Sequence, residues 1–168
     1  MLIVAHVEGW YYESIMESII DIKIQRNLQI PVDKKWFHTI IIRVLKLEKI
    51  KEAVDVSLFI TDDTKVKRLN KRYRGIDTTT DVLSFAVSEH MDTESFVIPS
   101  DGIRRLGEII ISYPQTLKQS GELGHDIQAE FRFLVVHGML HLLGYDHEQP
   151  DAERRMRSRE KVIVRHLE

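Results

Sequence analysis

Cysteine is absent from this chain of 168 residues. The absence excludes disulfide bonds and thiolate metal sites, so any transition metal must be bound by imidazole or carboxylate groups. Long apolar runs are absent too, since no stretch approaches the roughly 20 residues that a membrane-spanning helix needs. The first residues, MLIVAHVEGWYYES, lack the basic start and the small-residue cleavage site of a signal peptide. We therefore expect a cytoplasmic protein that makes no contact with membranes.

An excess of positive charge is also missing. The chain has 24 lysines and arginines against 26 aspartates and glutamates, for a formal net charge of -2. A strong basic excess is usual for proteins that coat nucleic acids, so that class is disfavoured. Internal repeats, low-complexity tracts and linkers rich in proline or glycine are not found either. Because a chain of this length can bury a core of its own, we expect one globular domain.

Hydrophobic periodicity and capping residues predict a mixture of strands and helices. Alternating or β-branched runs predict strands at residues 19–24, 54–60, 82–87 and 109–112. Spacings of three and four residues, preceded by capping residues or proline, predict helices at about 34–50, 63–73, from 114, 126–143 and 151–166. The polar segment 88–105 is expected to be a loop. This order predicts an α+β fold in which helices cover a sheet.

Histidine supplies the clearest functional signal. The stretch HGMLHLLGYDH places His137 and His141 four residues apart on a predicted helix. Side chains at this spacing project from one helix face, so both rings can reach one metal ion. Gly144 can adopt a left-handed conformation at the helix end and bring His147 back to the same point. Three imidazoles leave one coordination position open, as in catalytic zinc sites. The alternative is a set of unrelated histidines, for which this spacing would be a rare coincidence.

The same stretch lacks the general base of the zinc peptidases. Their pattern HxxxHxxGxxH carries a glutamate after the first histidine, and Gly138 occupies that position here. Glycine has no group that takes a proton from metal-bound water, so a peptidase of this type is disfavoured. Asp146, beside the third histidine, can orient a ligand ring or act as a base, but it can equally be a turn residue. Metal-bound hydroxide can also act without a separate base.

Three stretches resemble signatures of the YbeY family, metal-dependent endoribonucleases of bacterial ribosomal RNA maturation. HGMLHLLGYDH is similar to the family's HGxLHLxGYDH. LNKRYRGIDTTTDVLSF is similar to LNxxYRGxDxPTDVLSF, with Thr79 in place of the usual proline, and LGEIIIS is similar to LGDIxIS. The resemblance runs from about residue 17 to the C-terminus. It therefore predicts a domain at residues 17–168, preceded by an N-terminal extension, residues 1–16, without a counterpart in the family.

The resemblance implies a zincin-like α+β domain with a mixed four-stranded sheet. It also implies that His137, His141 and His147 bind one zinc ion per chain, and that Arg74, in the YRG segment, acts on the substrate. The chemistry of arginine agrees with this role. A guanidinium stays charged at any working pH and can bond two non-bridging oxygens of a phosphodiester as negative charge develops there.

Arg74 ends a basic segment, KVKRLNKRYR, in which six of ten residues are basic. Such a segment can contact RNA phosphates, and Tyr73 can offer its ring for a base to stack upon. The alternative is an ordinary solvated helix face, since nearby aspartates weaken the positive field.

These features predict a zinc-dependent endoribonuclease that favours single-stranded RNA and acts in ribosomal RNA maturation and ribosome quality control. Metal-bound water would attack phosphorus while Arg74 stabilises the developing charge, although attack by the RNA's own 2'-hydroxyl fits the same residues. The expected partners are precursor ribosomal RNA and the small ribosomal subunit or its proteins, without DNA. The rival is a ribosome-assembly factor with a mainly structural zinc. Structural zinc normally has four protein ligands, and only three are evident here.

Overall fold

The computed structural model describes residues 17–87, 101–146 and 149–168, which form four strands and five helices. In chain order these are β1 (Ile19–Ile24), α2 (Lys34–Leu47), β2 (Ala53–Thr61), α3 (Asp63–Arg74), β3 (Val82–Ala86), β4 (Ile103–Ser112), α4 (Tyr113–Leu123), α5 (Ile127–Leu142) and α6 (Pro150–Leu167). The predicted order of strands and helices is confirmed. The expected N-terminal extension, residues 1–16, lies outside the described residues.

The four strands form one mixed sheet in the order β1-β2-β4-β3. β1, β2 and β4 run parallel, and β3 is antiparallel to β4. β4 begins at Ile103, so the prediction of a loop over 88–105 is wrong for its last three residues, and residues 88–100 lie outside the described part of the chain. The arginines at positions 104 and 105 are not typical of a buried strand, so the sequence did not indicate a strand here. The strand includes them because residues 103–105 pair with residues 53–55 of β2. A mixed four-stranded α+β fold, as predicted, is therefore confirmed.

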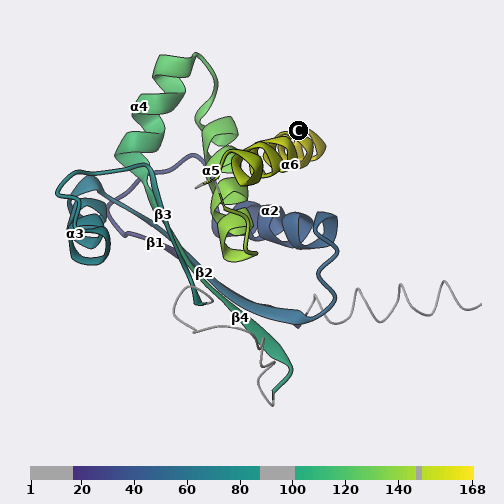
Figure 1. Ribbon diagram of the computed structural model, residues 1–168. Coiled ribbons are helices and arrows are strands. Elements are labelled where there is room, and N and C mark those ends of the chain that lie inside the picture. Colours follow the sequence, from purple (N-terminus) through teal and green to yellow (C-terminus); the bar gives the residue numbers. More distant parts are fainter. Residues whose placement is uncertain (1–16, 88–100, 147–148) are drawn as a thin grey trace, which may run out of the picture.

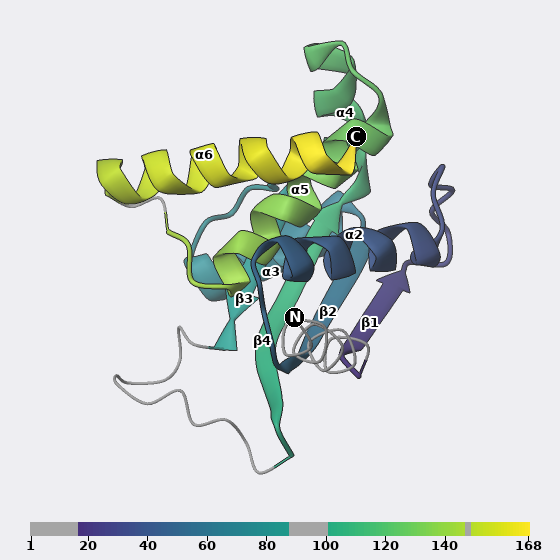
Figure 2. The same ribbon diagram turned by 90° about the vertical axis from the view of Figure 1, so that its right-hand side faces the viewer.

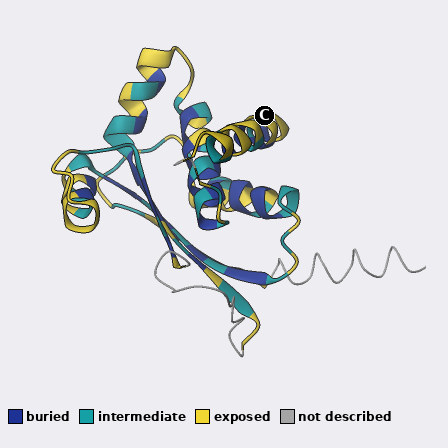
Figure 3. Cartoon of the chain, viewed as in Figure 1, coloured by how far each residue is buried: buried dark blue, intermediate teal, exposed yellow. Residues whose placement is uncertain are grey.

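Helices cover both faces of the sheet. Figure 1 shows α3 on one face, with α2, α5 and α6 on the other. Figures 1 and 2 together place α6 on the side of α5 that faces away from the sheet. The buried sides of α2 and α5 point toward the strands, while α6 is exposed along most of its outer surface (Figure 3). α5 is thus enclosed between the sheet and α6.

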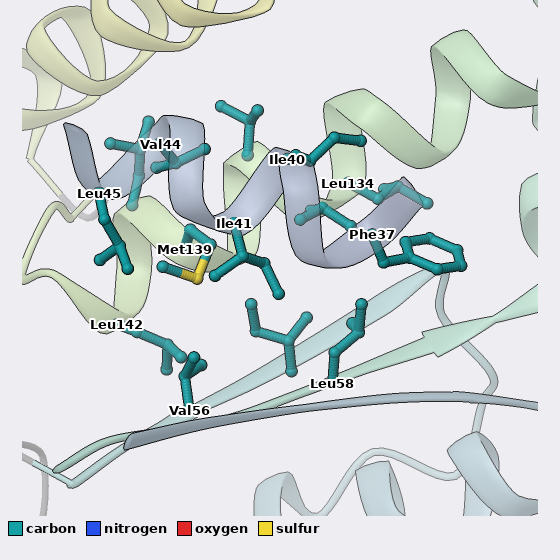
Figure 4. Close-up of a cluster of buried hydrophobic side chains, with 14 of the residues drawn as sticks. Phe37, Ile40, Ile41, Val44, Leu45, Val56, Leu58, Leu134, Met139 and Leu142 are labelled. Carbon is teal, nitrogen blue, oxygen red and sulfur yellow. The ribbon is translucent and has the colours of Figure 1, made fainter. Parts of the chain in front are cut away.

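The main core lies between the sheet and the pair α2 and α5 (Figure 4). Fully buried side chains from three elements meet there: Phe37, Ile41 and Leu45 of α2, Leu134 and Met139 of α5, and Val56 and Leu58 of β2. α2 ends at Leu47, three residues before the predicted end. The reason is Lys49, whose φ of 56° stops the helix.

Candidate metal centre

Two of the three predicted histidine ligands meet on α5. The helix is capped by Asp126, whose side chain accepts a hydrogen bond from the backbone N–H of Ala129. Its helical spacing stacks His137 and His141 on one face, with Nε2 of the two rings 3.1 Å apart and ring centroids 4.6 Å apart. The structure thus turns the same nitrogen of both rings toward a common point.

This arrangement fits a transition metal. With metal–nitrogen bonds of about 2.0–2.1 Å, two ligands of a tetrahedral zinc ion lie about 3.3 Å apart, close to the separation of the two Nε2 atoms. Imidazole is also one of the two donor types, with carboxylate, that a chain without cysteine can offer. The pair therefore has the geometry that two ligands of the predicted set require.

A buried carboxylate supports the first histidine. Oε1 of Glu160, on α6, lies 2.6 Å from Nδ1 of His137. A ligand histidine commonly donates its second ring N–H to a carboxylate, which fixes the ring and its tautomer. Sequence reasoning missed Glu160, because the last helix was interpreted from its many exposed charges. The signal was its register, since Glu160 shares a buried stripe with Met156 and Ile163.

The third predicted ligand, His147, lies outside the described residues. Gly144 has a φ of 96°, so the predicted left-handed turn after α5 is confirmed. Beyond it, Asp146 is exposed, and its function stays a prediction. Among the residues that the structure describes, no group of three or more histidine, cysteine, aspartate or glutamate side chains could hold a metal ion. The complete ligand set therefore also stays a prediction.

Tyr145 anchors the chain just after this turn. Its hydroxyl donates a hydrogen bond to Oε2 of Glu48 at 2.9 Å, and Nε of Arg159 donates to Oε1 of the same carboxylate at 2.5 Å. Burial raises the pKa of the Tyr145 hydroxyl, and the hydrogen bond to Glu48 raises it further. Tyr145 is thereby held at the C-terminal end of α2.

Gly138 lies against the sheet. A Cβ atom added to it would stand 2.8 Å from Cγ2 and 3.0 Å from Cδ1 of Ile109, a fully buried residue of β4. Real carbon atoms do not approach this closely without displacement. The position next to the first histidine therefore lacks both a carboxylate and the space for one, which agrees with the prediction that the chain does not use a peptidase base.

Arg74 is the last residue of α3, which Gly75 ends with a left-handed φ of 72°. Nη2 of Arg74 donates a hydrogen bond to the carbonyl of Ser84 at 3.4 Å. Ser84 lies in β3, the strand against which α5 also packs. Arg74 and the helix of the two histidines therefore contact the same strand, while α3 and α5 lie on opposite faces of the sheet.

The basic segment on α3 is only partly neutralised. Lys71 and Lys67 pair with Asp77 at 2.8 and 3.7 Å. Within the described part of the chain, the arginines of this segment, Arg68, Arg72 and Arg74, form no ion pair with a carboxylate. The unpaired arginines are available to an anionic ligand.

Tyr73 presents an aromatic surface beside these arginines. The residue is 57% exposed, and its ring packs at a tilt against Phe85, with centroids 5.1 Å apart. The guanidinium of Arg72 lies 5.4 Å from the centre of the same ring. An exposed ring among arginines is a combination suited to stacking and phosphate contacts.

Comparison with known proteins gives a consistent assignment. The family model described as Endoribonuclease YbeY matches residues 20–168. Proteins named Endoribonuclease YbeY from Roseiflexus sp. (strain RS-1) and Moorella thermoacetica are 45% and 43% identical to this chain. The matches cover 90% and 80% of this chain and 94% and 88% of those relatives.

A solved structure has a similar fold. The solution structure of TM1509 from Thermotoga maritima matches with a TM-score of 0.57 and 25% identity, covering 87% of each chain. Both of these relatives are named as endoribonucleases. The chain belongs to the Endoribonuclease YbeY family. In its described part, no helix is long and apolar enough to cross a membrane.

Proposed function

We propose that this protein is a zinc-dependent endoribonuclease that favours single-stranded RNA and acts in ribosomal RNA maturation and ribosome quality control. Membership of the family supports RNA cleavage, since its relatives are named endoribonucleases. The observation that carries the metal dependence is the convergence of Nε2 of His137 and His141 at 3.1 Å. A pair of imidazoles held this way is a metal-binding unit that lacks only further ligands.

The proposed ligands are His137, His141 and His147. Zinc bound by them would act as a Lewis acid and make a water molecule acidic enough to supply hydroxide near neutral pH. Oε1 of Glu160 lies 2.6 Å from Nδ1 of His137, so the Nε2 atom of this ring is the one left for the metal. Asp146 is proposed either to orient a ligand or to take a proton from the attacking group, because it lies next to His147 in the sequence.

Arg74 is proposed to stabilise charge on the phosphodiester. Its contact with the Ser84 carbonyl is long, at 3.4 Å, and the residue is exposed, so the guanidinium can turn toward a phosphate at low cost. The attraction between this guanidinium and the phosphodiester is strongest when negative charge develops on the non-bridging oxygens. Arg68, Arg72 and Tyr73 extend the RNA contact along α3, where stacking favours unpaired bases.

The proposed partners are precursor ribosomal RNA and the small ribosomal subunit or its proteins. The rival function, an assembly factor with a structural zinc and no nuclease activity, uses the same RNA surface. It requires a closed metal site with a fourth protein ligand. Gly138 cannot supply one, whereas Asp146 and Glu148 both lie next to the third histidine in the sequence.

Cleavage assays with defined RNA test the proposal. Zinc-loaded protein should cut an unstructured RNA faster than the same RNA annealed to its complement, and should leave a DNA of matching sequence intact. Protein stripped with a chelator and the His141→Ala variant should both be inactive. A 5'-phosphate or a 2',3'-cyclic phosphate among the product ends tells attack by water from attack by the 2'-hydroxyl. Absence of cleavage by rigorously purified, zinc-loaded protein would favour the assembly factor.

A further inference from the structure

Glu160 lies on the buried side of α6, where the other buried side chains are apolar. The buried residues of this helix are Met156, Glu160, Ile163 and Leu167, at spacings of three and four. Glu160 is only 8% exposed, whereas Glu153 on the same helix has a side chain that is 40% exposed and pairs with Arg157 at the surface. A carboxylate in the buried stripe is costly to desolvate, so an apolar residue would suit the packing better.

The compensation for this burial is a hydrogen bond to one histidine. Among the described residues, His137 is the hydrogen-bonding partner of the Glu160 carboxylate, at 2.6 Å. An ionised carboxylate only accepts hydrogen bonds, so Nδ1 of His137 must carry the hydrogen. The lone pair of the neutral ring then lies on Nε2, the atom that faces Nε2 of His141.

We propose that Glu160 is a positioning residue for metal binding: through α6, it holds His137 in the tautomer and orientation that direct Nε2 to the metal. The inference rests on the proposed metal site and adds to it a group from a different helix. Figure 2 shows α6 on the side of α5 that faces away from the sheet. From there Glu160 reaches Nδ1 of His137.

The chain contains a matched pair for comparison. Nε2 of His125 lies 2.6 Å from Oε2 of Glu130, another buried glutamate, which is 3% exposed. His125 precedes α5 and is not a proposed ligand. If the hydrogen bond between a histidine and a buried glutamate served stability alone, both pairs would respond alike to substitution.

Zinc affinity measured by competition with a chelating indicator tests the inference. Glu160→Gln should bind zinc about 10- to 100-fold more weakly than the parent protein, because the glutamine amide can donate as well as accept and leaves both tautomers populated. Glu130→Gln should bind zinc as the parent does. Thermal unfolding of the metal-free proteins reports any loss of packing separately. If Glu160→Gln does not fold, Glu160→Asp replaces it in the test. This variant keeps the charge on a side chain one methylene shorter, and it should bind zinc more weakly than the parent protein but lose less affinity than the roughly 10- to 100-fold expected for glutamine.

Nitrogen-15 shifts of the histidine rings in metal-free protein provide a second measurement. The parent protein should show His137 with its hydrogen on Nδ1, and Glu160→Gln should show a mixture of tautomers. Parental zinc affinity in Glu160→Gln, or an equal loss in Glu130→Gln, would overturn the inference.

The outcomes separate this inference from the proposed function. If the parent binds zinc but does not cut RNA, the proposed function fails while the affinity comparison still decides the inference. If the parent cuts RNA and Glu160→Gln keeps full affinity, only the inference fails. A parent protein that binds no zinc overturns both.

Discussion

Replacing Gly138 with alanine tests how closely the ligand helix rests on the sheet. The new Cβ would lie 2.8 Å from Cγ2, 3.0 Å from Cδ1 and 3.1 Å from Cγ1 of Ile109. Ile109 is fully buried and β-branched, so its side chain has little freedom to move aside. α5 must therefore shift away from β4, or the isoleucine must leave its rotamer.

The expected magnitude is the balance of two opposing effects. Alanine favours the helix over glycine by about 0.8–1 kcal/mol. Overpacking of a filled core costs about 1–3 kcal/mol. We expect the packing term to exceed the gain, with a net loss of about 1 kcal/mol, which corresponds to a fall in Tm of about 2–4 °C for a domain of this size.

Gly121→Ala is the matched control. Gly121 lies in α4, and a Cβ there would meet nothing within 4 Å, so this change should stabilise the protein through helix propensity alone. Urea unfolding of metal-free protein measures both variants. Adding Ile109→Ala to Gly138→Ala should give a favourable coupling energy, because the new methyl group then fills part of the cavity. If Gly138→Ala stabilised the protein as much as Gly121→Ala, the proposed contact between helix and sheet would be refuted.

Three further outcomes are expected. Arg74→Ala should lose roughly 10²-fold in RNA cleavage at saturating RNA while keeping zinc, and Arg74→Lys should recover only part, because an ammonium cannot span two phosphoryl oxygens. Unchanged turnover in Arg74→Ala would rule out its catalytic role. His141→Ala should purify with little zinc by elemental analysis and lose the stabilisation that zinc gives the parent, whereas near-stoichiometric zinc would contradict the ligand assignment. Burial raises the pKa of Glu52. The hydrogen bond from Arg104 at 3.1 Å, two backbone hydrogen bonds and the positive charge of Arg104 together outweigh burial and hold the pKa below its usual range. The resulting stability is present above the ordinary glutamate pKa of about 4.3 and is lost as pH falls. Glu52→Gln should therefore be less stable at neutral pH, and a gap that persists undiminished in acid would contradict this.

The fold was largely predictable because local signals and tertiary structure agree in most elements. Asp62 and Gly75 mark the two ends of α3 in the sequence, and the structure uses both as caps. Disagreement arose where tertiary pairing decides. Arg104 and Arg105 resemble loop residues, yet pairing with β2 makes them part of β4. Such pairing cannot be read from a local sequence window.

The site was predictable in part for a similar reason. His137 and His141 belong to one helix, so their meeting follows from helical spacing alone. Glu160 comes from another helix, 23 residues further on, and reaches His137 only through the packing of α6 on α5. Its place in an apolar stripe was visible in the sequence, but its partner was not.

The hydrogen bond between Arg74 and Ser84 has a consequence for self-association. Among the described strands, β3 pairs only with β4, so its other edge has no strand partner in the described part of the chain. Since the backbone N–H of Ser112 donates to the carbonyl of Asp81, the antiparallel alternation directs the carbonyl of Ser84 outward. An open edge is a template for strand addition by a second chain, and a charged side chain bound to its carbonyl obstructs such pairing. Arg74 is therefore expected to hinder edge-to-edge association as well, and size-exclusion chromatography of Arg74→Ala tests whether the variant associates more than the parent protein does.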